Sequence, residues 1–352
     1  NRFVTRNDLL KLFRMTILAS GVILVLLLAA QDLKIPGAVF LLYIWKDVYI
    51  VILVEVFWSF ANLVFPIHLA KWTYGLFCVM GNLGGVVGNI GVGYAAKEMG
   101  TAKTLWLILP LFGLIWLSCL FFSRLVGPVG GQSKEKARSN FKEGFQILKK
   151  SRYLLLMLWL IALVQIVVTL IDYQYNVFIQ QNYPGMDQRT AVIGQVYAAI
   201  DIAAISLQLL TGPILRFIGI PITLMAIPLL LGSTVISFIL IPRFLTVALT
   251  KVTSKSLTYS LFKAAKEILY IPLSYAEKTQ GKAIVDMMTY RVAKGAASLL
   301  LLLLTVLKAS TQISYLTFLL LLLWAGITWK IIQRYRKMTE PDEESKLDEN
   351  TA

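Results

Sequence analysis

The chain has 352 residues, of which 57% are hydrophobic and only 15% charged, and its formal net charge is +15. A mean hydropathy of +0.71 argues against a soluble enzyme or a soluble nucleic-acid-binding domain. Apolar runs of about 20 residues recur along the chain, which is the length of a helix that crosses the hydrocarbon core of a bilayer. We therefore predict an all-α polytopic membrane protein.

Ten membrane-spanning helices are predicted in chain order. Four precede a long basic stretch and six follow it, and their predicted limits are 15–30, 37–64, 71–95, 104–123, 153–176, 190–211, 218–241, 243–262, 283–306 and 312–333. Major-facilitator transporters are built from two halves of six helices each. We expect a major-facilitator-like fold with about ten helices present of an expected twelve, in a sequence that begins part-way through a longer protein.

The predicted organisation has four parts. The remainder of an amino-terminal helical half (1–123) is followed by a basic cytoplasmic linker (124–152). A carboxyl-terminal helical half (153–333) and a disordered acidic tail (334–352) come next. In the linker, Phe141, Phe145 and Leu148 recur at helical spacing between lysines. This pattern predicts a short amphipathic helix on the anionic inner leaflet or, equally, a solvated helix that holds the two halves together.

The positive charge is distributed unevenly between the two sides of the membrane. Only six of the 34 lysines and arginines fall on the side opposite the amino terminus: Lys34, Lys97, Lys103, Arg189, Arg243 and Lys308. Such asymmetry follows the positive-inside rule, so both termini and the linker are predicted to be cytoplasmic. The charge therefore indicates topology, and no nucleic acid is expected as a partner.

A glycine-rich run at 81–89 has the composition of a phosphate-binding loop but lacks its Lys-Ser/Thr end. Gly81 and Gly85, like Gly84 and Gly88, are four residues apart within a predicted span. This spacing is typical of membrane helices that pack closely. We interpret the run as a packing surface.

No enzymatic motif is present: the sequence has no nucleophile elbow, no P-loop and no HExxH zinc motif. The cysteines, Cys78 and Cys119, lie in apolar spans and are predicted to be reduced core residues. With a single histidine, His68, a metal site is not expected. We predict that the protein is not an enzyme and has no metal or other cofactor.

Charged residues inside the predicted spans are the candidates for function. They are Asp47, Glu55, Asp172, Asp201 and Asp286, together with Lys46, Lys251, Lys255, Arg291 and Lys294. A charge at mid-bilayer costs about 2.5–3.5 kcal/mol, so such groups usually face a wet cavity or a partner. Glu55 and Asp201 lie deep in their spans, and we expect them to line a cavity, pair with a cation or be protonated.

The cations fall in two pairs at helical spacing. Lys251 and Lys255 are four residues apart on one span, and Arg291 and Lys294 are three apart on another. Two helices could therefore offer four cations to one cavity, an arrangement suited to a polyphosphate. The alternative is that Asp286 pairs with a lysine or arginine as a latch between the halves.

Trp58 and Asn62 are four residues apart in the segment FWSFAN at 57–62. An adenine could stack on the indole ring and hydrogen-bond to the amide. Ordinary core packing is the alternative interpretation for Trp58.

Three blocks of sequence carry a family resemblance. They are FWSFAN with Ala70-Lys71 and Tyr74-Gly75, then Gln208 with Thr211-Gly212, Arg216 and Gly219, and most specifically KEILYIPL at 266–273 followed by GKAIVD at 281–286. Together they resemble the ATP/ADP translocase family of plastids and intracellular bacteria, nucleotide exchangers with a major-facilitator-like architecture. The resemblance implies that basic residues bind phosphates and that carboxylates serve coupling and ion pairing. By this resemblance, Lys266, Lys282 and Lys294 are expected to bind phosphates, and Asp286 is expected to serve coupling or ion pairing.

The expected function is exchange of ATP-type and ADP-type nucleotides by alternating access. The expected partners are an anionic nucleotide and the lipid bilayer, in a bacterial inner membrane or a plastid-type envelope. One alternative is a proton-coupled major-facilitator transporter of another anionic solute, with Asp201 and Glu55 as proton carriers. Another is a membrane receptor or scaffold that does not transport.

Overall fold

The computed structural model describes residues 9–64, 67–126, 141–274, 277, 281–307 and 312–339. Within these ranges, side chains are not described at 9–10, 12, 55–56, 59–64, 67–75, 78, 125–126, 141–144, 283 and 287–288. Most of the predicted acidic tail and residues 127–140 of the predicted linker lie outside the described part of the chain.

Every element in the described ranges is a helix, which confirms the predicted all-α polytopic fold. Each of the ten predicted spans lies on helix, and seven helices in these ranges are long and apolar enough to cross a membrane. The physical reason is that lipid offers no hydrogen-bond partner to the backbone, so a spanning segment must satisfy its peptide groups internally.

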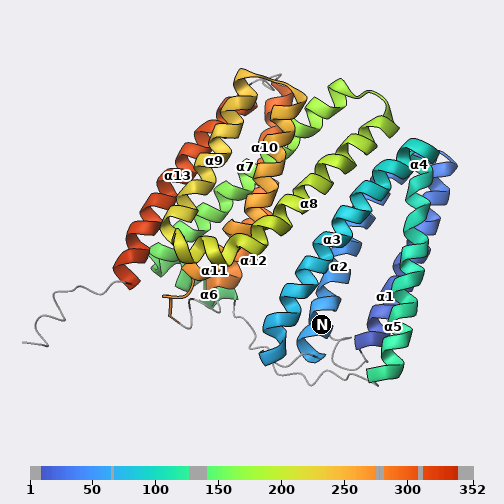
Figure 1. Cartoon of the computed structure of the whole chain (residues 1–352), viewed down its shortest axis with the longest axis horizontal. Coiled ribbons are helices and arrows are strands. Elements are labelled where there is room, and N and C mark those ends of the chain that lie inside the picture. Colours follow the sequence, from blue (N-terminus) through green and yellow to red (C-terminus); the bar gives the residue numbers. More distant parts are fainter. Residues whose placement is uncertain are drawn as a thin grey trace, which may run out of the picture. The chain divides into compact units, whose positions relative to one another are not determined.

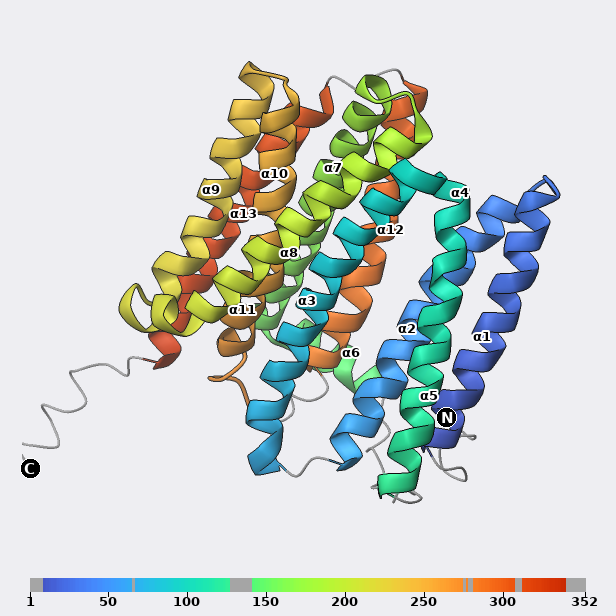
Figure 2. The ribbon, with the colours of Figure 1, turned by 45° about the vertical axis from the view of Figure 1, so that its right-hand side comes forward.

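The chain divides into two compact units, of which the first takes in 1–81 and 91–136. Its helices are α1 (Leu9–Asp32), α2 (Ala38–Val64), all of α3 (Ile67–Met99) except a middle stretch, α4 (Thr101–Thr104), a 3-10 turn (Leu105–Leu107) and α5 (Ile108–Val126). Helix α1 packs against α2 and α5 (Figure 2).

The core of the first unit joins α1 to α5. Ile17, Leu24 and Leu28 of α1 are buried together with Phe112 and Cys119 of α5. Their spacing along α1 places them on one face of the helix. Cys119 is a free buried thiol, as predicted, whereas the side chain of Cys78 lies outside the described part of the structure.

The second unit takes in 137–352 and also 82–90, the middle stretch of α3. Its own helices are α6 (Phe141–Lys150), α7 (Arg152–Asn182), α8 (Met186–Phe217), α9 (Ile220–Leu240), α10 (Phe244–Leu257), the π-helical η2 (Thr258–Phe262), α11 (Lys263–Leu269), α12 (Lys282–Val306) and α13 (Gln312–Thr339). Helix α7 is central, because it packs against α10, α12 and α13 (Figure 1).

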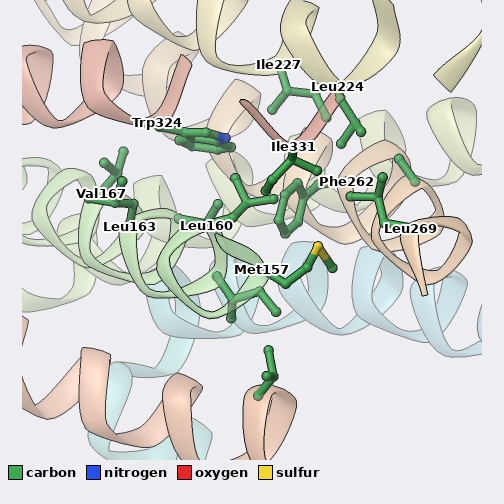
Figure 3. Close-up of a cluster of buried hydrophobic side chains, with 14 of the residues drawn as sticks. Met157, Leu160, Leu163, Val167, Leu224, Ile227, Phe262, Leu269, Trp324 and Ile331 are labelled. Carbon is green, nitrogen blue, oxygen red and sulfur yellow. The ribbon is translucent and has the colours of Figure 1, made fainter. Parts of the chain in front are cut away.

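The core of the second unit forms around α7. Figure 3 shows Met157, Leu160, Leu163 and Val167, which recur every three or four residues along α7, facing side chains from other helices. Trp324 of α13 is 1% exposed and meets Phe262 edge to face, with ring centroids 5.9 Å apart (Figure 3). This packing fixes α13 and the π-helical segment on α7, and so positions α10, which directly precedes η2.

Helix α6 lies within the predicted linker. Leu148 is buried in the core of the second unit, and α6 packs against α7 and α12. Phe145 is exposed, with the Lys149 ammonium 5.0 Å from its ring centroid. One side of α6 is therefore fixed to the second unit and the other presents apolar and basic groups outward.

We predict that Trp324→Ala lowers the free energy of unfolding by about 3–5 kcal/mol, because it leaves a cavity where α13 meets α7 and η2. Denaturant unfolding of the purified protein in detergent measures this change. Trp159→Ala, at a position 57% exposed on α7, is the matched control and should change stability far less. Equal losses in both variants would contradict the proposed core.

Candidate functional site

A buried cluster of one carboxylate and two lysines joins α7 to α10. Lys251 Nζ lies 2.7 Å from Asp172 Oδ1, and Lys255 Nζ lies 2.8 Å from Asp172 Oδ2. Lys251 is fully buried, whereas the side chains of Lys255 and Asp172 are 13% and 29% exposed. The cluster, which we call the Asp172 cluster, carries a formal net charge of +1 and has one accessible edge.

Aromatic rings surround the two ammonium groups. The Lys251 Nζ atom lies 5.1 Å from the ring centroid of Tyr175 and 5.2 Å from that of Tyr197, and Lys255 Nζ lies 5.6 Å from the ring of Tyr259. Cation–π contacts of this kind strengthen when the cation is removed from water. The rings therefore give each ammonium group a favourable contact away from bulk solvent.

Two polar groups of the same region are buried without a hydrogen-bond partner among the described residues. They are the Tyr175 hydroxyl and the Ser254 hydroxyl, the latter on α10 between the two lysines. A buried polar group without a partner is costly and often marks a place where a ligand or water completes the site. The π-helical η2 that follows Lys255 is also a feature found often at functional sites.

The Asp172 cluster was only partly predictable. The spacing of Lys251 and Lys255 predicted that they share a helix face, and the structure brings them together. Asp172 was recognised as an intramembrane charge, but its role as their shared partner was missed. The polar run Asp172-Tyr173-Gln174-Tyr175 within an apolar span was the available signal.

Arg291 and Lys294 lie on exposed positions of α12. Both α10 and α12 pack on α7, but none of the described ion pairs or hydrogen bonds connects Arg291 or Lys294 to the Asp172 cluster. The predicted meeting of all four cations in one cavity therefore stays a prediction.

A second charged network joins α11 to α12. Lys266 Nζ lies 2.9 Å from Asp286 Oδ1, and the Tyr270 hydroxyl donates to the same oxygen at 3.2 Å. Lys282 pairs with Glu267 and its ammonium lies 5.0 Å from the Tyr270 ring. Burial, together with the neighbouring Asp286 carboxylate, raises the pKa of Tyr270. The phenol therefore stays protonated and can donate a hydrogen bond.

This network bears on three residues that the sequence analysis proposed as functional. Lys266 and Lys282 each have a carboxylate partner, and Asp286 has both a lysine and a phenol. The latch considered as an alternative is thus present as an ion pair, but it lies within the second unit rather than between the halves. It fixes the segment after η2 to the start of α12.

Asp201 of α8 contacts the stretch of α3 that belongs to the second unit. Asn89 Nδ2 donates to Asp201 Oδ2 at 2.9 Å, and one heptad away Asn82 Nδ2 donates to Gln208 Oε1 at 2.9 Å. A Cβ atom on Gly85 would come within 2.5 Å of Asp201 Oδ2. Gly85 therefore permits this close approach, whereas a Cβ atom on Gly81, Gly84 or Gly88 would meet nothing within 4 Å, so the structure supports the packing interpretation at Gly85 alone.

The remaining candidates lie on α2. The Trp58 ring is half-buried and meets Phe57 edge to face, with centroids 5.4 Å apart. The side chains of Glu55 and Asn62 lie outside the described part of the structure. The proposed adenine contact and the proposed coupling role of Glu55 stay predictions.

Comparison with known proteins gives a consistent family assignment. The profile of the family described as TLC ATP/ADP transporter matches residues 38–337. Among curated relatives, ADP,ATP carrier protein 1 of Chlamydia pneumoniae is 25% identical over 71% of this chain and 57% of its own length. The carrier of the same name from Rickettsia typhi is 27% identical over 69% of this chain and 56% of its own length. ADP,ATP carrier protein 3 of Rickettsia bellii is 22% identical, over 85% and 70%.

The chain thus spans just over half the length of the first two of these relatives. Identity of this order, spread over most of the chain, supports a shared fold and family, and it confirms the resemblance seen in the sequence.

We predict that Asp172→Asn lowers the free energy of unfolding by about 3–5 kcal/mol, because it leaves two lysines without a counter-charge. Adding Lys251→Met should restore part of the loss, since the fully buried cation is then removed. Denaturant unfolding of the single and double variants measures the coupling. Strictly additive losses would show that the ion pair does not stabilise the fold.

The approach at Gly85 gives a second prediction. Gly85→Ala should displace Asp201 from Asn89 and cost about 1–3 kcal/mol of stability, because the new methyl group overlaps the carboxylate. Gly84→Ala is the matched control, since a Cβ there meets nothing within 4 Å, and it should leave stability unchanged or slightly higher. The same thermal melt serves both variants, and indistinguishable midpoints would argue against the contact.

Proposed function

Because the chain belongs to the TLC ATP/ADP transporter family, we propose that it exchanges ATP for ADP across a membrane, and that Lys251 and Lys255 bind the phosphates. The observation that carries this proposal is the Asp172 cluster: two lysines share one carboxylate, and Lys255 and Asp172 are partly exposed. The relatives named ADP,ATP carrier protein support the choice of nucleotide.

In the proposed mechanism, Asp172 is an internal counter-ion. Without substrate, it holds both ammonium groups, so that neither is left uncompensated in a medium of low dielectric constant. A phosphate that enters at the exposed edge offers several anionic oxygens to the same two donors. The substrate then replaces Asp172 as their partner, at a smaller cost than if the cations had stood alone.

The surrounding groups would complete nucleotide binding. The hydroxyls of Tyr175 and Ser254 are available donors once a phosphate is near, and the rings of Tyr197 and Tyr259 offer aromatic surface beside the lysines. No bond in the nucleotide has to break, because each nucleotide follows its own gradient. ATP and ADP carry unequal charge, so the membrane potential also acts on the exchange.

The other candidate residues have supporting roles in this proposal. Arg291 and Lys294 on α12, with Trp58 and Asn62 on α2, are proposed as further nucleotide contacts. Lys266, Lys282 and Asp286 are proposed to hold α11 against α12 during transport. The proposed location is a bacterial inner membrane or a plastid-type envelope, with both termini in the cytoplasm, as the distribution of lysine and arginine favours.

A second candidate function rests on Asp201. Among the described residues its hydrogen-bond partner is the neutral amide of Asn89, with no cation within ion-pair distance. Acidic side chains inside membrane spans commonly serve as proton relays in transporters. This observation favours proton-coupled transport of another anionic solute, with Asp201 as the proton carrier.

The test is uptake by the complete gene product reconstituted in proteoliposomes loaded with ADP. External labelled ATP should enter, excess unlabelled ADP outside should compete, and a protonophore should have no effect. Uptake that collapses with protonophore and ignores nucleotides would overturn nucleotide exchange in favour of the second candidate.

We predict that Lys255→Gln lowers the apparent affinity for ATP about tenfold or more, because one charge-assisted hydrogen bond to phosphate is lost. Lys255 is chosen since it is partly exposed, whereas a change at Lys251 disturbs a fully buried group. Lys149→Gln, on the exposed side of α6, is the charge-matched control and should transport normally. Normal ATP affinity in a folded Lys255→Gln protein would exclude this residue from phosphate binding.

A further inference from the structure

The final turns of α13 lie between two adjoining hollows on the second unit. The first has a volume of about 800 Å³, and four cations line it together with Gln333: Lys330, Arg334, Arg336 and Lys337. The second has a volume of about 450 Å³ and is mainly apolar, with walls from α9 and α13. Gln333 and Arg336 line both, so the basic hollow and the apolar groove adjoin at these two side chains.

Helical spacing produces this division. Lys330, Arg334 and Lys337 follow one another at four and three residues, and so share one face of α13. Trp329 and Arg336 fall on the neighbouring face toward α9. None of the ion pairs among the described residues involves any of these cations, so their charge is available to an anion.

The walls of the groove are suited to a hydrocarbon chain. Ile222, Met225 and Leu229 come from successive turns of α9, and Trp329 and Ile332 come from α13. Trp329 is 58% exposed and Ile222 is 62% exposed, which are large apolar surfaces directly beside a concentration of positive charge. A soluble anion such as free phosphate would use the cations but leave this surface uncovered.

The position of the hollows relative to the bilayer follows from helix length. Helix α13 has 28 residues, about 42 Å at 1.5 Å per residue, which exceeds the ~30 Å hydrocarbon core. Its basic end therefore extends to the headgroup level, where tryptophan is also enriched. The positive-inside rule assigns this end to the cytoplasmic leaflet, the leaflet that carries anionic lipid.

We propose that this hollow and groove together bind one anionic phospholipid of the cytoplasmic leaflet. Its phosphate lies against Arg336, Lys337 and the neighbouring cations, and an acyl chain follows the groove between α9 and α13. This site is separate from the Asp172 cluster, so the proposal is independent of which solute is transported.

Native mass spectrometry of the full chain, released from detergent, tests the proposal. After incubation with equal amounts of phosphatidylglycerol and phosphatidylcholine of identical acyl chains, the protein should retain one phosphatidylglycerol. The double variant Arg336→Gln/Lys337→Gln should bind it about 30-fold more weakly, as expected for two basic residues at a membrane surface. Trp329→Ala should weaken retention of both lipids.

The charge-matched control is Lys97→Gln/Lys103→Gln, which removes two exposed cations from the other predicted side of the membrane. This variant should retain phosphatidylglycerol like the unaltered protein. Equal retention in the two double variants would overturn the proposal, as would equal retention of phosphatidylcholine by the unaltered protein. Displacement of the lipid by millimolar ATP or inorganic phosphate would instead make the hollow a soluble-anion site.

The acidic sequence after Thr339 is the other possible partner for these cations, with six carboxylates between 340 and 349. Phosphatidylglycerol bound by the full chain as tightly as by a chain ending at Thr339 supports the lipid site. Lipid retained only after removal of 340–352 would assign the cations to the acidic segment and contradict the proposal.

Discussion

An ammonium group buried between membrane helices is costly unless an opposite charge lies beside it, and this requirement links the helices of the second unit that carry such groups. Asp172 on the central helix α7 holds Lys251 and Lys255 of α10, and Asp286 on α12 holds Lys266 of α11. Apolar packing around Trp324 and the inner face of α7 supplies most of the buried surface, but many arrangements of leucines would serve equally well. The ion pairs are more selective, because among the described residues both Lys251 and Lys255 pair with the same carboxylate, that of Asp172 on α7.

The same constraint gives the proposed transport mechanism a physical basis. A site made of two uncompensated lysines would be costly whenever the carrier is empty, whereas a site already neutralised by several carboxylates would repel a nucleotide. One carboxylate for two cations lies between these limits and leaves the Asp172 cluster with a net positive charge. A phosphate can then exchange places with Asp172, so the buried cations have an anionic partner both with and without substrate.

Hydropathy and helix length were sufficient to place ten spans on helices, because both are local properties of the sequence. The family resemblance could be recognised most specifically from the segments at 266–273 and 281–286, and the shared face of Lys251 and Lys255 follows from their spacing alone. The partner of these lysines was not predictable, because Asp172 is 79 residues away from Lys251 and only the packing of α7 against α10 selects it. For the same reason the carboxylate partners of Lys266 and Lys282, which the family resemblance offered as phosphate ligands, could not be predicted, because they depend on where α11 lies relative to α12.

The most direct test of the central claim is a cryo-electron microscopy structure of the complete gene product with ADP bound. The proposed exchange of partners predicts phosphate oxygens within hydrogen-bond distance of Lys251 and Lys255, with the Asp172 carboxylate displaced from at least one of them. A bound nucleotide with its phosphates elsewhere, and both lysine–Asp172 contacts unchanged, would contradict the proposed role of the Asp172 cluster.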